Sequence, residues 1–209
     1  MVCCMARLIA LHPDNPQLRL IDQVIEVLHG GGVIVLPTDS SYALACLTGQ
    51  RSAVDRIVRI RQLDPRHDMT LLCRDLSNFG IFARMDNSAY RLIKRLTPGP
   101  YTFLLKATKE VPRRLQHPQK KTIGLRVPAH NVTLSILGRL NEPLMSSSLI
   151  LPGESLPETD ADEINTRIGG QVDLVINGGA GGLEPTTVLD LTKDIPAVVR
   201  QGRGDTSML

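Results

Sequence analysis

The segment from Gly30 to Cys46, GGGVIVLPTDSSYALAC, constrains the fold of this chain more than any other. Its glycines release the chain from a preceding helix, Val33 to Leu36 form a short aliphatic run, and Pro37 ends that run before a group of hydroxyl side chains. Such a run between glycine and proline predicts a buried strand of an α/β sheet, and a strand of this kind commonly ends at a ligand crevice. We therefore expect a site at Thr38 to Tyr42, although a polar turn that caps only its own backbone would have the same composition.

Length and composition favour a single globular domain. With 209 residues, of which 42% are hydrophobic, the chain can bury a sizeable core. We expect one domain with its core at about residues 17–203 and a leader at residues 1–5. The chain has neither a transmembrane run nor a signal-peptide pattern, so we expect a cytoplasmic protein with no membrane partner.

The cysteines do not predict a metal site or a disulfide framework. Cys3, Cys4, Cys46 and Cys73 show no CxxC spacing and no histidine at ligand distance in the sequence. We interpret Cys46 and Cys73 as small core residues and assign no role to Cys3 and Cys4.

Charge is distributed unevenly along the chain. The segment from Arg91 to Arg126 holds ten Lys or Arg residues against one acid, Glu110, so it carries +9 in a chain of net charge +3. Such a segment attracts phosphates, either of a nucleotide or of an RNA backbone. A solvated basic face without a ligand is the alternative interpretation.

Local patterns predict strands and helices in alternation. Asn15 and Pro16 indicate a helix start, and Ser52 with Asp55 indicates a second one. Residues 178–182 are rich in glycine but lack both the Walker A and the Rossmann pattern, so we interpret them as a flexible flap in preference to a phosphate cradle. The predicted strands are 6–11, 33–36, 70–73, 101–107, 122–127, 144–147 and three short ones within 173–202, and the predicted helices are 16–29, 52–61, 87–96, 132–140 and 162–168. This order predicts a mixed sheet covered by helices.

Several motifs, in the same order along the chain, resemble the YrdC/TsaC family. Pro37-Thr38-Asp39-Ser40 followed by Tyr42 is similar to the opening Pro-Thr-(Asp/Glu)-Thr-x-Tyr-Gly-Leu, with Ser40 in place of Thr and Ala43 in place of Gly. The agreement extends to about Gly202. The amino-acid sequence is most similar to the YciO branch at His12–Pro16, Arg59–Leu63 and Leu71–Leu76. Further matches are Pro98–Thr102, Gly124–Pro128, Asp173–Gly179, Thr186–Val188 and Val199–Gly202.

The resemblance implies a YrdC-like fold of the α/β class, with a twisted mixed sheet flanked by helices around a concave basic cavity. It also implies synthesis of threonylcarbamoyl-adenylate from L-threonine, bicarbonate and ATP, with release of pyrophosphate. Mg²⁺ would be bound through the phosphates of ATP, and the product would be used in tRNA modification. The implied catalytic residues are Arg59, Arg61 and Ser148, the nucleotide-binding residues Thr102, Arg126, Thr186 and Arg200, and the amino-acid-binding residues Ser40, Tyr42 and Ser146, with no metal held by the protein itself.

Two departures from the family pattern leave the activity open. The Lys-x-Arg motif of the synthases becomes Arg59-Ile60-Arg61, and their Ser-x-Asn motif becomes Ser148-Leu149-Ile150. Arginine is a broad fork where lysine is a compact charge, and isoleucine has no amide with which to orient a substrate. The alternative is a protein that has lost the synthase reaction and binds nucleotide, tRNA or double-stranded RNA through its basic cavity. The near absence of aromatic residues, 3%, makes any RNA contact one to backbone and shape.

Overall fold

The computed structural model describes residues 6–64 and 67–207. The expected leader, with Cys3 and Cys4, lies outside these residues. Within them, one mixed sheet of 11 strands has the order β1-β9-β2-β3-β8-β4-β7-β6-β10-β11, and β5 pairs with β6. The strands are β1 (Arg7–Ala10), β2 (Ile34–Leu36), β3 (Ala43–Leu47), β4 (Thr70–Leu72), β5 (Ala83–Arg84), β6 (Tyr101–Ala107), β7 (Thr122–Arg126), β8 (Leu144–Ser148), β9 (Leu174–Asn177), β10 (Thr187–Asp190) and β11 (Ala197–Arg200).

The sheet combines parallel and antiparallel pairs, as the sequence predicts. The pairs β1–β9, β9–β2, β4–β7 and β6–β10 are parallel. The pairs β2–β3, β3–β8, β8–β4, β7–β6, β10–β11 and β5–β6 are antiparallel. The protein is therefore a mixed α/β domain, and its central strands come from distant parts of the chain.

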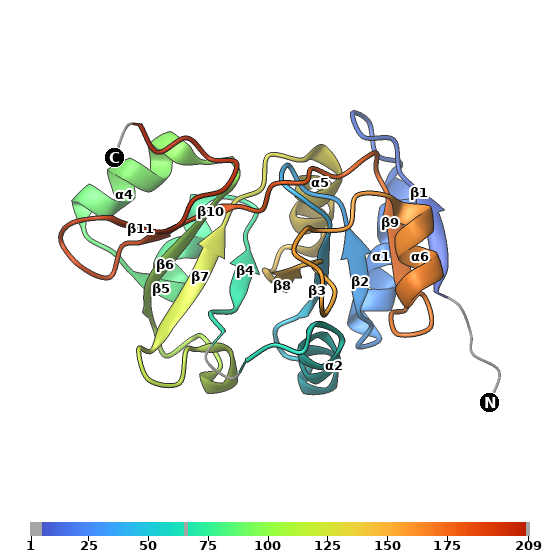
Figure 1. The fold of residues 1–209 in the computed structure, drawn as a ribbon, viewed down its shortest axis with the longest axis horizontal. Coiled ribbons are helices and arrows are strands. Elements are labelled where there is room, and N and C mark those ends of the chain that lie inside the picture. Colours follow the sequence, from blue (N-terminus) through green and yellow to red (C-terminus); the bar gives the residue numbers. More distant parts are fainter. Residues whose placement is uncertain (1–5, 65–66, 208–209) are drawn as a thin grey trace.

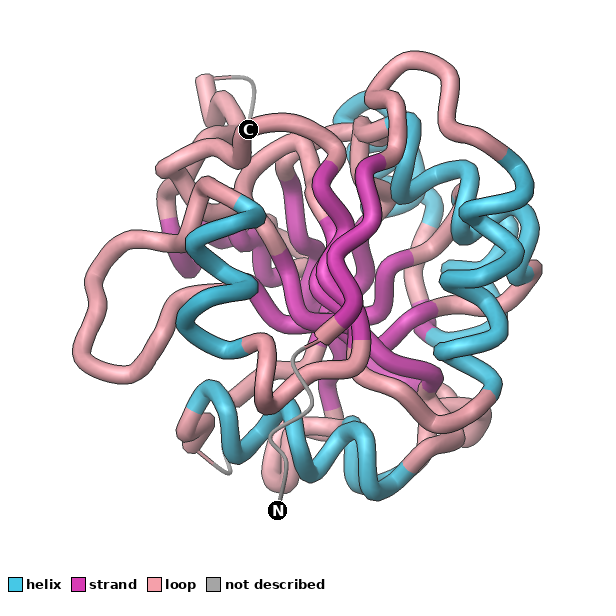
Figure 2. Tube along the Cα trace, turned by 90° about the vertical axis from the view of Figure 1, so that its right-hand side faces the viewer, coloured by secondary structure: helices cyan, strands magenta, loops and turns pink. Residues whose placement is uncertain are grey.

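Helices cover both faces of the sheet, and the alternation of side chains along β2 explains how (Figures 1 and 2). Val33 and Val35 join the core cluster that includes α2, α4 and α6, whereas Ile34 and Leu36 join the cluster that includes α1 and α5. Successive residues of a strand point to opposite faces, so an unbroken aliphatic run is what a strand buried on both sides requires. The helices are α1 (Leu18–His29), α2 (Arg51–Arg61), α3 (Phe79–Phe82), α4 (Asn87–Leu96), α5 (Asn131–Leu140) and α6 (Ala161–Ile168), with short 3₁₀ turns η1 (Leu76–Asn78) and η2 (Arg113–Leu115).

The starts predicted from Asn15 and Ser52 are wrong, and the predicted start of α4 is confirmed. α1 begins at Leu18 and not at Pro16, because the His12 Nδ1 atom accepts hydrogen bonds from the backbone N–H groups of Asp14 and Asn15 and holds them in a turn. α2 begins at Arg51, so Ser52 is already helical. α4 has the predicted bounds, and its N-cap Asp86 accepts a hydrogen bond from the Ala89 N–H.

Strand β3 has no counterpart among the predicted strands, and it shows that the hydroxyl motif, residues 38–42, lies in a hairpin connection. Leu36 of β2 pairs with Ala43 of β3, so residues 37–42 form the connection of an antiparallel hairpin. Every residue of β3 is buried, and its sequence ALACL neither alternates nor contains β-branched residues. The strand therefore lacks the usual sequence signals, and its neighbours β2 and β8 supply its hydrogen bonds.

Cys46 and Cys73 are buried free thiols in the core, as predicted. Among the described residues, no helix is both long and apolar enough to cross a membrane.

Candidate functional site

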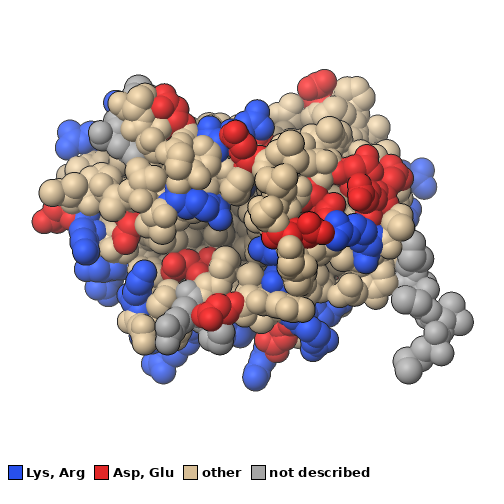
Figure 3. Space-filling view, in the orientation of Figure 1, with Lys and Arg blue, Asp and Glu red and all other residues tan. Residues whose placement is uncertain are grey.

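A cavity of about 300 Å³ lies between the two halves of the sheet, and Figure 3 shows the molecule hollowed near the middle of that view. Its size is at the lower end of the range for small-molecule sites. Strand residues form most of its walls. The others come from the end of α2, the connection to β4, the segment after β8 and the residue before β10. The lining residues are Ala43, Arg61, His67, Asp68, Thr70, Thr102, Leu104, Arg126, Ser146, Ser147, Ser148, Ile150, Thr186, Val188, Val199 and Arg200.

On β6, strand alternation decides which side chains face the cavity. Thr102 and Leu104 of β6 line it, while Phe103 between them packs in the core. Gly124 of β7 lies close to Thr70 and Thr102. A Cβ atom at position 124 would be 2.8 Å from Thr70 Oγ1 and 3.1 Å from Thr102 Cγ2. A larger residue at position 124 would therefore crowd two hydroxyl-bearing side chains of the site.

Three arginines line the cavity among the described residues, and each is the last residue of its element. Arg61 ends α2, Arg126 ends β7 and Arg200 ends β11. Burial lowers the pKa of all three guanidinium groups, and for Arg200 the charge of Arg126 lowers the pKa further. Arginine stays protonated at neutral pH despite such shifts, so the cavity concentrates positive charge.

Arg126 is oriented by the hydroxyl motif. Its Nη2 atom donates to Asp39 Oδ1 at 2.5 Å and to Thr38 Oγ1 at 3.2 Å. Its Nε atom and the other carboxylate oxygen of Asp39 are buried and have no hydrogen-bond partner within the described part of the chain. A buried charged donor without a partner is costly, so both this atom and the equally unpartnered Nε of Arg61 are available to an anionic ligand.

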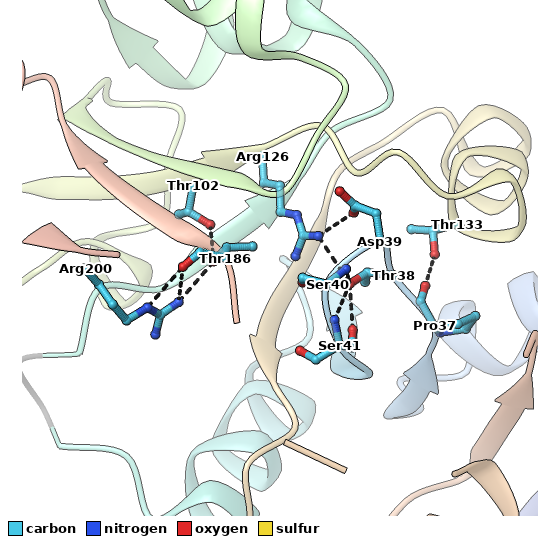
Figure 4. A network of polar contacts seen from close by, with 10 residues as sticks. All are labelled: Pro37, Thr38, Asp39, Ser40, Ser41, Thr102, Arg126, Thr133, Thr186 and Arg200. Carbon is cyan, nitrogen blue, oxygen red and sulfur yellow. Dashed lines mark hydrogen bonds and ion pairs between the residues drawn. The ribbon is translucent and has the colours of Figure 1, made fainter. Parts of the chain in front are cut away.

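A second polar cluster of lining residues lies to the left of Arg126 and Asp39 in Figure 4. Arg200 donates to the Thr186 carbonyl oxygen from Nε at 3.1 Å and from Nη2 at 2.9 Å, and Nη2 is 3.0 Å from Thr186 Oγ1. Thr102 Oγ1 also donates to Thr186 Oγ1, at 3.1 Å. These contacts fix the guanidinium of Arg200 on a strand at the end of the sheet.

Seven of the ten predicted site residues line the cavity: Arg61, Thr102, Arg126, Ser146, Ser148, Thr186 and Arg200. Arg59 does not, because two residues along a helix turn the side chain by about 200°, and Arg59 is exposed. Ser40 and Tyr42 are fully buried beside the cavity and do not line it. Ser40 Oγ lies 3.1 Å from Thr38 Oγ1, which connects it to Arg126 through one hydroxyl group.

The glycine-rich loop at residues 178–182 packs closely on the hydroxyl motif. Tyr42 donates from its hydroxyl to the Gly179 carbonyl oxygen at 2.6 Å, and Gly181 N–H donates to the Thr159 carbonyl oxygen at 2.8 Å. A Cβ atom at Gly182 would lie 2.2 Å from the Ser40 carbonyl oxygen. The loop therefore needs glycine for close approach to residues 40–42, which the interpretation as a free flap did not anticipate.

Comparison with known proteins identifies the family of the chain. A family model described as telomere recombination, which unites Sua5, YciO and YrdC, matches residues 26–202. The chain belongs to the Sua5/YciO/YrdC family. The uncharacterized protein YciO of Escherichia coli K12 is 54% identical over 201 residues, which are 96% of this chain and 98% of YciO.

Solved structures of Sua5/YciO/YrdC proteins have the same fold. The crystal structure of E. coli YciO matches with a TM-score of 0.95 at 53% identity and covers 97% of this chain and 98% of its own. P. abyssi Sua5 complexed with L-threonine matches with a TM-score of 0.85 at 24% identity and covers 93% of this chain and 57% of that one. At such low identity the second match shows the fold alone. The predicted YrdC-like α/β fold and the likeness to the YciO branch are confirmed.

Sequence reasoning about this Sua5/YciO/YrdC protein missed two polar residues of the cavity, His67 and Asp68. Both lie in the connection between α2 and β4, which the sequence indicates only as a turn. The available signal was their position: they follow Arg61 closely and precede a buried strand, so the turn must return along the end of the sheet. Asp39 was recognised as part of the hydroxyl motif, but its pairing with Arg126, 87 positions away, has no local signal.

Proposed function

We propose that the protein is a nucleotidyltransferase of the L-threonylcarbamoyladenylate synthase type, which joins L-threonine, bicarbonate and ATP and releases pyrophosphate. One observation carries this proposal: Arg61, Arg126 and Arg200, from three distant segments, line one cavity together with hydroxyl groups. The P. abyssi Sua5 protein, which was crystallised in complex with L-threonine, supports the choice of amino acid.

The reaction explains why such a cavity needs several cations. The amine of L-threonine and bicarbonate form a carbamate with loss of water. A carbamate oxygen then attacks the α-phosphorus of ATP, so two anions must approach each other, and negative charge builds up as pyrophosphate leaves. Preorganised guanidinium groups stabilise that charge without reorganisation during the reaction. Arg61 and Arg126 each have a buried Nε atom left for a phosphate oxygen, and Arg200 is held by Thr186.

Magnesium would accompany the phosphates and not be bound by the protein directly. Among the described residues, no group of three His, Cys, Asp or Glu side chains could hold a metal ion. Mg²⁺ commonly takes its ligands from substrate phosphates and water, which fits a cavity built from arginines and hydroxyls.

The hydroxyl groups of the cavity receive different roles in this proposal. Thr102 and Thr186 lie with Arg200 and are assigned to the nucleotide, with Ser148 at the reacting phosphate. Ser146, whose hydroxyl donates to the Thr70 carbonyl oxygen at 3.3 Å, is assigned to L-threonine. Ser40 and Tyr42, which the sequence also assigns to L-threonine, support the site from outside the cavity: Ser40 is connected to Arg126 through Thr38, and Tyr42 binds the glycine-rich loop.

The test is a pyrophosphate-release assay with ATP, Mg²⁺ and bicarbonate, in the presence and absence of L-threonine. We expect release that depends on L-threonine and is lost in Arg61→Ala. Arg59→Ala is the matched control, because it removes the same side chain from the same helix at an exposed position outside the cavity. Absence of threonine-dependent release from the wild-type protein would overturn the synthase proposal.

Ile150 provides a sharper test of the chemistry. It lines the cavity at the position where the synthase motif has asparagine. Ile150→Asn restores an amide that can accept and donate, so we expect faster turnover if that amide orients the substrates. Ile195→Asn, at a site 80% exposed and outside the cavity, controls for the polar substitution itself.

A second candidate function, binding to a double-stranded RNA backbone, is favoured by the surface outside the cavity. Nine of the ten basic residues between Arg91 and Arg126 are exposed, and only Arg126 is buried. The exposed ones lie on α4, on the end of β6 and in the connection to β7, where Figure 3 shows Lys and Arg side chains. This surface carries the basic segment that the sequence predicts to attract an RNA backbone, and it lies outside the cavity, which the sequence also predicts as an RNA-binding site.

Salt titration tests the RNA proposal. Each phosphate contact contributes about 0.7–0.9 to the slope of log affinity against log salt, so binding should weaken steeply. Lys106→Glu combined with Lys109→Glu should reduce affinity and slope, whereas Lys193→Glu on the β10–β11 connection should change them less. Affinity that hardly responds to salt would contradict this surface as the contact.

A further inference from the structure

His67 lines the same cavity as the three arginines, at its solvent side. It lies in the connection between α2 and β4, four residues before the buried Leu71. The function proposed above assigns nothing to it. Because His67 is exposed in part, its imidazole ring can exchange protons with water while it faces the cavity.

The charges around His67 oppose its protonation. Partial burial and the positive charges of Arg61 on α2 and Arg200 on β11 lower its pKa, whereas Asp68 and Asp64 of its own connection raise it and only partly offset this effect. Arg126 of β7 adds a further positive charge to the same cavity. The ring is therefore mostly neutral at neutral pH, since even an unperturbed histidine has a pKa of about 6.5.

A bound polyphosphate reverses this balance. Its negative charges neutralise the guanidinium groups that repel a protonated ring, and they add an anion within the cavity that His67 lines. Nearby opposite charge favours the charged form of a histidine. The same residue can thus be neutral in the free protein and cationic in the complex.

We infer that His67 is a fourth cation of the cavity, formed only when the polyphosphate of a nucleotide binds and the imidazole ring takes up one proton from solvent. This inference rests on the proposed nucleotide-binding function and adds a residue and a pH dependence to it. Arg61, Arg126 and Arg200 attract any anion, whereas protonated His67 favours ligands with enough negative charge to recruit the proton.

Proton uptake has a defined sign. Binding raises the pKa of His67, so protons are absorbed between the pKa of the free protein and that of the complex. Affinity for the nucleotide rises as pH falls through this interval and levels off below it. A shift of one pKa unit corresponds to about a tenfold change in affinity.

The direct experiment follows the His67 ring protons by NMR through a pH titration, with and without MgATP. Magnesium keeps the terminal phosphate of ATP ionised in this pH range, so the ligand contributes little titration of its own. We expect the pKa of His67 to rise on binding. His29, an exposed histidine at the end of α1 outside the cavity, is the control, and we expect MgATP to leave its ring signals unchanged.

Variants provide an independent measurement by calorimetry in buffers of different ionisation enthalpy. His67→Gln should remove proton uptake and bind MgATP about as well as the wild type above pH 7.5, but several-fold more weakly near pH 6. His67→Lys carries its charge permanently, so it should bind at least as tightly as the wild type without proton uptake. His29→Gln should behave like the wild type.

The outcomes separate the two proposals. Failure of the wild-type protein to bind MgATP at any pH would overturn both the proposed function and this inference. Binding of MgATP with an unchanged His67 titration, or with equal proton uptake in His67→Gln, would overturn the inference alone and leave the nucleotide site intact.

Discussion

Asp39 and Arg126 form an ion pair in which the two side chains are only 10% and 5% exposed. The pair joins the β2–β3 connection to the end of β7, so it links two parts of the sheet at the edge of the cavity. Thr38 accepts a further hydrogen bond from the same guanidinium nitrogen and holds the backbone of residues 40 and 41 through its own hydroxyl. One hydrogen-bond network thus fixes both the backbone of the hydroxyl motif and the orientation of the buried Arg126 side chain.

Loss of the carboxylate should destabilise the fold. Asp39→Ala leaves the guanidinium of Arg126 buried without its counter-ion, which typically costs about 3–5 kcal/mol. We expect a decrease of this order in the free energy of unfolding, measured by urea denaturation. Asp55→Ala is the matched control, because its ion pair with Arg51 is exposed on α2 and contributes at most about 1 kcal/mol. Equal effects of the two substitutions would contradict a structural role for the buried pair.

The contact between the glycine-rich loop and the hydroxyl motif can be tested at Gly182. Gly182→Ala places a methyl group 2.2 Å from the Ser40 carbonyl oxygen, so the loop must move. Overpacking of this kind costs about 1–3 kcal/mol. The measurement is again urea denaturation, with Gly49→Ala as control because nothing lies within 4 Å of a Cβ atom there. Equal free energies of unfolding for the two variants would show that the loop can move to accommodate a methyl group at position 182 without loss of stability.

Arg200 should matter for ligand affinity more than for stability. Its strand β11 is exposed along its whole length, and its guanidinium lines the cavity. We expect Arg200→Ala to weaken MgATP binding at least tenfold, since a hydrogen bond to a charged group contributes about 1.5–3 kcal/mol. Calorimetry measures this change, and Arg84→Ala on β5 is the control for removal of an exposed arginine. Unchanged affinity in Arg200→Ala would exclude this residue from the nucleotide site.

Cys46 and Cys73 should resist alkylation until the protein unfolds. Burial raises the pKa of both thiols to about 12, so they remain protonated in the folded protein at pH 8 to 10. In the unfolded chain they ionise near their ordinary pKa, which means that proton release favours unfolding as pH rises through about 9. Peptide mass spectrometry after iodoacetamide treatment checks this, with a denatured sample as control. Rapid labelling of either residue in the folded protein would contradict its placement in the core.

The order of most strands and helices could be predicted from the sequence because their signals are local. The aliphatic run before Pro37 predicts β2, and the apolar periodicity up to Leu96 predicts α4 with its bounds. Strand β3 could not be predicted, since its small residues gain strand geometry only from pairing with β2 and β8. The start of α1 was missed because a single side chain, His12, holds the preceding turn.

The residues of the candidate site that could be predicted belong to family motifs. The residues that were missed belong to no motif and reach the cavity only through the tertiary structure. Arg61, Arg126 and Arg200 were expected to converge, and they do. Arg59 was selected by its place in a motif, but the helical turn directs it away from the cavity. His67 belongs to no motif, and its nearness to Arg200 depends on how a loop returns to β4, which a linear pattern does not encode.

The position of β11 has a consequence for how the protein is made. β11 ends the strand order of the sheet, and among the described strands it is also the last along the chain. On the ribosome, the chain can complete its central strands while Arg200 is still in the exit tunnel. Until β11 is synthesised, the nascent chain lacks the third guanidinium of the cavity, so a product truncated before β11 would keep the central strands and have an incomplete cavity.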